Sequence, residues 1–175
     1  MLRFCFNEDV SIEDLCVVLG LADLVFGPNT DVTQYNPSLD DFFDFHKKFP
    51  FCICVIKKED VVVGFATAVL CSNILKDSFL SGVVSGPELV NRAHLNFNNS
   101  QFDSLYLMDA YIDKEFRRQG LIKDAFFKII SFYKIKNESL HLFAWPHSSA
   151  GLALCKSLSA GFNLNFSYLE SNINL

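Results

Sequence analysis

One stretch, residues 105–133, constrains the fold most, because it changes from a strand pattern to a helix pattern around a short basic turn. Its first part, residues 105–112, is rich in the apolar and aromatic residues that favour β-strands. In its last part, apolar residues recur at spacings of three and four, which predicts one buried helical face: Leu121, Ile122, Ala125, Phe126, Ile129, Ile130 and Tyr133. The turn between them contains Arg117, Arg118 and Gly120, and no carboxylate occurs from Arg117 to Lys123. Free backbone N–H groups and the positive end of a helix dipole meet there, which predicts a phosphate-binding point.

Length and composition predict one globular domain spanning residues 1–175. Half of the residues are hydrophobic and one fifth are charged, which is typical of a folded chain rather than a disordered one. The net charge of −5 argues against nucleic acid as a partner, because an acidic protein offers no broad basic surface to a phosphate backbone. A local basic spot at Arg117 and Arg118 is compatible with this balance.

The N-terminus and the cysteines indicate where the protein resides. Residues 1–10 carry two acidic side chains and no long apolar run, which does not fit a secretion signal. No uncharged apolar stretch reaches about 18 residues, so we expect no membrane span and no membrane partner. The six cysteines are scattered among apolar residues, and Cys52 and Cys54 lack the second ligand pair that a zinc site requires. We therefore expect a cytoplasmic protein with reduced cysteines and no metal site.

The remaining periodicity predicts the order of the other elements. They are a strand at 2–6, helices that begin at Ser11 and Ser38, a hairpin of strands at 51–56 and 61–72, a strand at 139–145, a helix at 151–158 that ends at Gly161, and a strand at 162–169. We interpret residues 73–103 as an irregular insertion beside the site, with a short helix at 87–94. The order is β-α-α-β-β-(insertion)-β-α-β-α-β, with an optional strand at the end. This predicts an α/β (α+β) fold with a mixed sheet and helices on both faces. Gly64 indicates a bulge or a close backbone neighbour.

The basic turn alone is a weak motif, because many proteins that bind no phosphate have such a turn before a helix. Its surroundings are more specific. A strand ending in Ile112, followed by Arg117 and Gly120 at the start of a long helix, resembles the GNAT superfamily of acyl-CoA-dependent N-acyltransferases. That family carries Arg/Gln-x-x-Gly-x-Gly/Ala after an apolar strand, within a mixed, largely antiparallel sheet. The resemblance covers nearly the whole chain, apart from residues 73–103.

The resemblance implies a site for acetyl-CoA as co-substrate, with no metal. Backbone N–H groups from the second to the sixth motif position would hold the pyrophosphate, and the strand end would pair with the pantetheine arm. One strand-end N–H would also polarise the thioester carbonyl. The residues assigned to the cofactor in this way are Ala110, Tyr111, Ile112, Arg117, Arg118, Gln119, Gly120, Leu121, Ile122 and Ser148.

Some positions depart from the family pattern. Ile122 takes the sixth motif position in place of Gly or Ala, so its side chain has to point away from the phosphates. The Asn that commonly begins the family's fourth helix falls near Ser148 or Ala150. The position of the Tyr that protonates the leaving thiolate falls near Cys155 or Ser157. These two residues are the alternatives for that catalytic position, and neither is a tyrosine, so the family's usual general acid is absent.

Asp109 is the preferred general base. It shares a strand face with Tyr111, and the acidic-x-aromatic-aliphatic pattern that it begins resembles diamine-acting members of the family. A carboxylate there could take a proton from an ammonium substrate, directly or through a water. Alternatively, Asp109 only hydrogen-bonds backbone or substrate. His94 and His147 are weaker candidates for a base, and the other two histidines are expected to be structural.

These observations leave two main functional hypotheses. The first is an N-acyltransferase that moves an acetyl group from acetyl-CoA to a primary amine by direct attack in a ternary complex. Its acceptor would be a small-molecule amine, a protein lysine or an N-terminal amine, and the protein could act as a homodimer. The second is a catalytically inactive GNAT-like acyl-CoA-binding sensor or interaction module. A plain structural domain whose basic turn faces solvent is a third reading.

Overall fold

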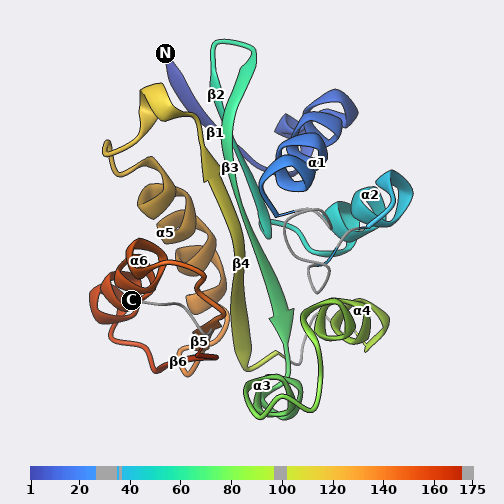
Figure 1. The fold of residues 1–175 in the computed structure, drawn as a ribbon, viewed down its shortest axis with the longest axis vertical. Helices are drawn as coiled ribbons and strands as arrows, with labels where there is room; N and C mark the ends of the chain where they lie inside the picture. Colours follow the sequence, from blue (N-terminus) through green and yellow to red (C-terminus); the bar gives the residue numbers. More distant parts are fainter. Residues whose placement is uncertain (27–34, 36, 97–101, 171–175) are drawn as a thin grey trace. The chain divides into compact units, whose positions relative to one another are not determined.

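The computed structural model describes residues 1–26, 35, 37–96 and 102–170 (Figure 1). Its strands are β1 (Leu2–Cys5), β2 (Ile53–Lys58), β3 (Val61–Cys71), β4 (Ser104–Ile112), β5 (His141–Ala144) and β6 (Phe166–Tyr168). Its helices are α1 (Ile12–Phe26), α2 (Leu39–Lys48), α3 (Asn73–Leu80), α4 (Gly86–Asn96), α5 (Leu121–Lys134) and α6 (Ser149–Phe162), with short 3-10 turns η1 (Asn7–Asp9) and η2 (Lys114–Phe116). The predicted order of strands and of the main helices is confirmed.

The six strands are hydrogen-bonded in the order β1-β2-β3-β4-β5-β6. The pairs β1–β2 and β2–β3 are antiparallel, whereas β4–β5 and β5–β6 are parallel. The backbone N–H of Asp113 donates to Val63 O at 2.9 Å, and Asp109 lies opposite Thr67, so β3 and β4 run antiparallel. The predicted mixed sheet is therefore confirmed.

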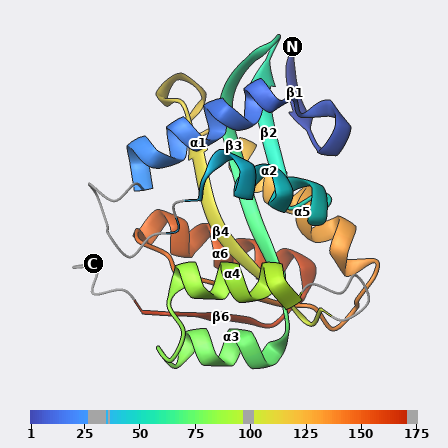
Figure 2. The same cartoon turned by 90° about the vertical axis from the view of Figure 1, so that its right-hand side faces the viewer.

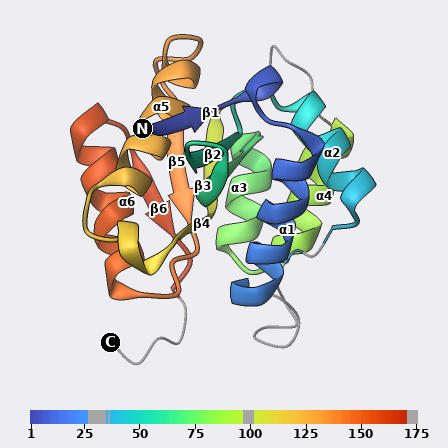
Figure 3. The same ribbon diagram turned by 90° about the horizontal axis from the view of Figure 1, so that it is seen from above.

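The chain forms two compact units, and the strands β3 and β4 contribute to both. The first unit comprises Met1–Thr67 and Asp109–Ile129, and the second comprises Ala68–Met108 and Ile130–Leu175. Within the first unit, α1 and α2 lie on one side of the strands and the start of α5 lies on the other (Figure 3). Within the second unit, α3 and α4 lie side by side (Figure 2), and α6 packs against β5 and β6.

Serine side chains cap the first two helices, as the sequence predicts. Ser11 Oγ accepts the backbone N–H of Asp14 at 3.2 Å, while the Asp14 carboxylate accepts the N–H of Ser11 at 3.0 Å. These reciprocal bonds form a capping box. At the start of α2, Ser38 Oγ accepts the N–H of Asp41 at 3.2 Å. The ion pair between Lys57 Nζ and Asp14, at 2.8 Å and largely buried, then ties α1 to β2.

The prediction of an irregular insertion at 73–103 is wrong for most of its length, whereas the short helix predicted at 87–94 is confirmed as part of α4. Residues 73–80 and 86–96 form α3 and α4, and the connection between them includes Gly82 in the left-handed region (φ +75°). Each helix starts at a serine cap, since Ser72 Oγ accepts the N–H of Leu75 and Ser85 Oγ accepts the N–H of Glu88. The helix α3 buries only Lys76 and Phe79, and α4 buries only Leu89, Val90 and Ala93, which are too few positions for a helical period to stand out in the sequence. Residues 97–101 lie outside the described chain.

Two further boundaries differ from the prediction because of backbone conformation. Phe51 has φ +65°, which no strand residue adopts, so β2 begins at Ile53 and extends to Lys58 in register with Leu2. The helix α6 continues through Gly161, whose α-carbon faces open space, and ends where Asn163 adopts φ +51°. The last strand is accordingly shorter, and an additional strand after residue 170 would lie outside the described residues.

Glycine 64 is required by a close approach of two strands, as predicted. A Cβ placed on Gly64 would lie 2.6 Å from Tyr111 O and 2.6 Å from the side chain of Ile112. The β2–β3 register also shifts between Ile56 and Lys57, directly beside Gly64. The absence of a side chain at Gly64 therefore allows the end of β4 to reach its observed position.

Other sequence expectations concern cysteines, metals and membranes. All six cysteines are free thiols, and all except Cys16 are buried. Among the described residues, no group of three or more His, Cys, Asp or Glu side chains is placed to hold a metal ion. No helix in the described ranges combines the length and the apolar character needed to cross a membrane.

Candidate acyl-CoA and catalytic site

The end of β4, the turn after it and the start of α5 bring ten of the predicted site residues into one continuous segment of the first unit. These residues are Asp109, Ala110, Tyr111, Ile112, Arg117, Arg118, Gln119, Gly120, Leu121 and Ile122. The strand supplies the first four, and α5 begins directly after Gly120. We refer to residues 117–120 as the basic turn.

The basic turn has an unusual backbone. Arg118 (φ +64°) and Gly120 (φ +78°) both lie in the left-handed region. Gly120 adopts this conformation without cost, but for Arg118 it costs about 1 kcal/mol. Strain of this kind persists only where the surrounding structure imposes it, and it is concentrated at functional sites.

This backbone leaves a series of hydrogen-bond donors available. In the described part of the chain, the N–H groups of residues 118–123 have no hydrogen-bond partner. The first bond of α5 runs from Asp124 N–H to Gly120 O, at 2.9 Å, so the preceding N–H groups are the orphan donors of a helix start. Unpaired donors together with the positive end of the helix dipole suit an anion.

Side chains of the turn hold its backbone in place. Arg117 Nε donates to Ile112 O at 3.2 Å, and Gln119 Nε2 donates to Glu115 O at 3.2 Å. The first bond connects the turn to the end of β4, and the second closes it over η2. The Arg118 side chain is exposed, and the described residues provide no partner for its guanidinium. Arg117 thus holds the turn in place, whereas Arg118 presents a cation to solvent.

The last residues of β4 carry backbone groups that point away from β3. Because Asp109 and Asp113 direct their N–H groups toward β3, the alternation of an antiparallel ladder turns those of Ala110 and Ile112 to the opposite side. The ladder between β4 and β5 ends at Leu107 and Ala144, whereas β4 continues to Ile112. The backbone of the strand end is therefore able to pair with an extended ligand.

Asp109 combines partial exposure with a perturbed pKa. Burial among neutral groups raises the pKa of its carboxyl to about 7, and no charged side chain contributes to the shift. The residue as a whole is intermediate in burial, so it is not sealed completely from solvent. The described residues offer no hydrogen-bond partner to its carboxylate oxygens. A carboxyl that titrates near neutral pH is suited to general base catalysis.

The other predicted site residues lie in the second unit. Ser148 Oγ caps α6 by accepting the N–H of Gly151 at 3.0 Å. Cys155 is buried, which raises the pKa of its thiol to about 11, and Ser157 is exposed on the same helix. His147 is exposed beside the Trp145 ring. The roles of Ser148, Cys155 and Ser157 stay predictions.

Two residues were missed by the sequence reasoning. Thr67 is 2% exposed, and its hydroxyl contacts the backbone of Asp109. A hydroxyl within the apolar run of β3 was the available signal, because a buried polar group needs a partner. The indole N–H of Trp145 is buried, and no described residue accepts a hydrogen bond from it. No sequence pattern indicates that second feature.

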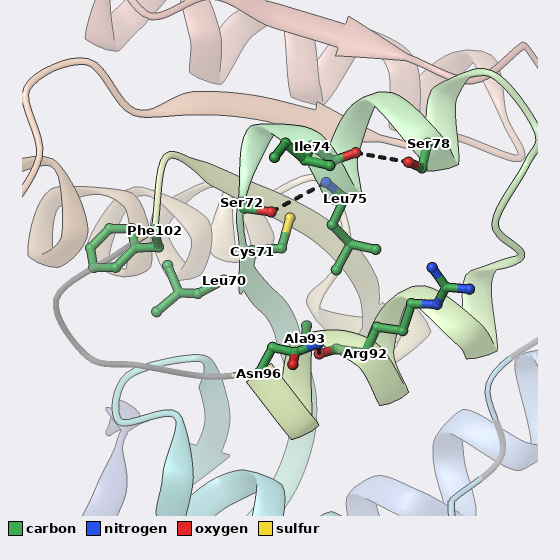
Figure 4. A pocket seen from close by; sticks show the side chains of 10 residues that line it. All are labelled: Leu70, Cys71, Ser72, Ile74, Leu75, Ser78, Arg92, Ala93, Asn96 and Phe102. Carbon is green, nitrogen blue, oxygen red and sulfur yellow. Dashed lines mark hydrogen bonds between the residues drawn. The ribbon is translucent and has the colours of Figure 1, made fainter.

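A well-defined cavity of about 230 Å³ lies in the second unit between α3, α4 and the end of β3 (Figure 4). None of the predicted site residues lines it. Its serine hydroxyls are already engaged, since Ser72 caps α3 and Ser78 Oγ donates to Ile74 O at 2.9 Å. Because its lining includes neither Asp109 nor any residue of the basic turn, this cavity is separate from the predicted site.

Comparison with known proteins identifies the architecture. No model of a known sequence family and no curated protein sequence matches the chain. Among solved structures, an acetyltransferase from Trypanosoma brucei is 15% identical, with 100% of this chain and 99% of that chain covered and a TM-score of 0.57. The aminoglycoside N-acetyltransferase AAC(6')-Iy in complex with CoA is 11% identical, with 100% and 93% covered and a TM-score of 0.53.

A third similar structure is the loading GNATL domain of CurA from Lyngbya majuscula. It is 17% identical, with 75% of this chain covered and a TM-score of 0.53, and this chain spans 58% of its length. Identities this low inform on architecture rather than on activity. The chain has the fold of the GNAT superfamily.

Proposed function

We propose that the protein is an N-acyltransferase that transfers an acetyl group from acetyl-CoA to a primary amine by direct attack in a ternary complex. The observation that carries the proposal is the position of Asp109, whose pKa is raised to about 7, on the strand that leads into the basic turn. The GNAT fold and its similarity to acetyltransferases support the same reaction.

The described residues suit coenzyme A. The unpaired N–H groups of residues 118–122 would hold the pyrophosphate, and Arg118 would add a positive charge. The outward backbone groups of Ala110 and Ile112 would pair with the pantetheine arm. Ile122 is partly exposed at the sixth motif position, and it would have to turn its side chain away from the phosphates. Acetyl-CoA supplies an activated thioester.

The protein's own groups would handle the protons. Asp109 accepts a proton from the ammonium form of the acceptor, so that the amine lone pair can attack the thioester carbon. Because burial raises the pKa of the Asp109 carboxyl to about 7, the group can take up and release a proton near neutral pH. A backbone N–H at the end of β4 stabilises the charge that develops on the carbonyl oxygen. The parts that the resemblance assigns to Ser148 and to Cys155 or Ser157 stay predictions from the sequence.

The acceptor is proposed to be a small-molecule primary amine, because one structure with the same fold is an aminoglycoside N-acetyltransferase. A protein lysine or N-terminal amine is the alternative acceptor. We further propose that residues 1–175 work as one acyltransferase domain in the cytoplasm.

The proposal is tested by calorimetry with acetyl-CoA together with a thiol-release assay over a panel of amines between pH 5.5 and 9. We expect kcat/KM to rise about tenfold per pH unit below pH 7 and to level off above about pH 8. Asp109→Asn should lower kcat/KM by about 10²–10⁴ and leave acetyl-CoA binding unchanged. Asp113→Asn is the matched control, because the Asp113 carboxylate is already engaged by the Tyr111 hydroxyl at 2.7 Å.

A second function is favoured by Ile122 and by the lack of a tyrosine in α6, which spans Ser149–Phe162. In that case the protein would bind acyl-CoA as a sensor or interaction module. Acetyl-CoA binding without turnover of any amine would favour this function over the enzyme. A chain that binds no acetyl-CoA would exclude both.

A further inference from the structure

The buried hydroxyl of Thr67 contacts both backbone polar groups of Asp109. Thr67 Oγ1 accepts the N–H of Asp109 at 3.2 Å and donates to Asp109 O at 3.4 Å. Both residues belong to the first unit, and Thr67 is 2% exposed. A single hydroxyl can donate and accept at once, so this one side chain is satisfied entirely by Asp109.

This contact is well suited to holding a backbone in place. Threonine is branched at Cβ, so its side chain has few rotamers in a strand and its hydroxyl direction is restricted. Burial makes the loss of either bond costly, because water cannot replace the missing partner. On the same two strands, the bond from Asp113 N–H to Val63 O provides a second fixed point at 2.9 Å. Asp109 thus lies on a strand that is paired with β3, and these bonds help to hold that pairing.

The carboxylate of Asp109 depends on this backbone for its position. Among the described residues, no side chain hydrogen-bonds its carboxylate oxygens, and its raised pKa arises from burial alone. The described ion pairs involve other carboxylates. The location of Asp109 Cα and the direction of its Cα–Cβ bond therefore decide where the carboxylate lies. Small displacements of a catalytic group reduce rates strongly, by about 10²-fold for 1 Å.

We propose that Thr67 is the positioning residue for Asp109: its hydroxyl fixes the Asp109 backbone so that the carboxylate meets the acceptor amine. In this proposal Thr67 acts only through Asp109, whose backbone engages its hydroxyl. The role in turnover rests on the acyltransferase function proposed above, whereas the effect on Asp109 itself can be measured without turnover.

The experiment compares Thr67→Val, which keeps the shape and removes the hydroxyl, with Thr67→Ser, which keeps the hydroxyl. Ser104→Ala is the control, since Ser104 is a buried hydroxyl on the same strand as Asp109 that donates to Asn73 Oδ1 at 2.7 Å. Thermal melts establish that each variant folds, and Thr67→Ala replaces Thr67→Val if the latter does not. The measurements are kcat, the KM for acetyl-CoA, and the titration of the Asp109 carboxyl by carbon-13 NMR.

For Thr67→Val we expect kcat to fall 10- to 100-fold with the KM for acetyl-CoA within about twofold of the parent protein. Its Asp109 titration midpoint should move by one pH unit or more toward the ordinary aspartate range, because a displaced carboxyl regains solvent. Thr67→Ser should restore the parent kcat and the parent titration midpoint of Asp109. Ser104→Ala should lose thermal stability but keep the parent kcat and the parent midpoint.

Three results would overturn the proposal: a Thr67→Val titration identical to that of the parent, an equal loss of kcat in Ser104→Ala, or a failure of Thr67→Ser to restore the parent values. If the parent protein acetylates no amine, the acyltransferase function fails. The NMR comparison then still decides whether Thr67 positions Asp109.

Discussion

Replacing Gly120 by alanine should weaken coenzyme A binding, whereas the same replacement at Gly82 should not. The two glycines are matched, since φ is +78° at Gly120 and +75° at Gly82, and no atom lies within 4 Å of a Cβ built on either. Alanine in the left-handed region costs about 1 kcal/mol, so both variants should lose a similar amount of stability. The difference in coenzyme A affinity between the two variants therefore measures the contribution of the basic turn to binding.

The effect on affinity follows from the donors of the turn. To relieve strain at residue 120, the peptide groups on both sides rotate, and the N–H groups of Gly120 and Leu121 turn away from the phosphate position. One hydrogen bond to a charged group contributes about 1.5–3 kcal/mol, so the loss of one bond corresponds to a Kd about 10- to 150-fold higher. Gly82 lies in the connection between α3 and α4, so its replacement leaves those donors unchanged.

The assay is calorimetry with coenzyme A, combined with urea unfolding of both variants. We expect similar losses of stability, a raised Kd for Gly120→Ala and a parental Kd for Gly82→Ala. Parental affinity in Gly120→Ala would refute the assignment of the basic turn as the phosphate site. Equal losses of affinity in both variants would show that general destabilisation, not the turn, governs binding.

Two further predictions concern the frame around the site. Gly64→Ala should destabilise the protein by about 1–3 kcal/mol and lower the acyl-transfer rate, because the new Cβ would lie 2.6 Å from Tyr111 O and would displace the end of β4. Urea unfolding measures the stability, and kinetics with the most active amine measure the rate. An unchanged rate would contradict the link between Gly64 and the site. Lys57→Met should cost about 3 kcal/mol at pH 7, because it leaves the Asp14 carboxylate buried without its cation. Burial of the Asp14 carboxyl acts to raise its pKa, but the hydrogen bonds from Lys57 and Ser11 outweigh burial and lower the pKa in the folded protein. The stability that this group contributes is therefore present above its unfolded pKa and is lost as the pH falls through its folded pKa. The difference between Lys57→Met and the parent should therefore shrink at acidic pH, and a constant difference from pH 7 to pH 3 would contradict this origin.

The sequence by itself determined the features that depend on neighbours along the chain. The helix starts at Ser11 and Ser38 were predictable because a cap bonds to a backbone group three residues away. The strand, basic turn and helix at 105–133 were predictable for the same reason, since each has its own period or its own turn chemistry. The order of elements and the candidate phosphate site both follow from such local signals.

The tertiary structure decided what depends on residues far apart in sequence. Thr67 and Asp109 are 42 positions apart, and no pattern in either segment predicts that a hydroxyl of one strand holds the backbone of the other. The raised pKa of Asp109 likewise comes from burial, which other segments of the chain create. The sequence therefore made Asp109 a candidate base by its place on the strand. Only the fold raises the pKa of its carboxyl to about 7, because desolvation depends on what surrounds a group in space.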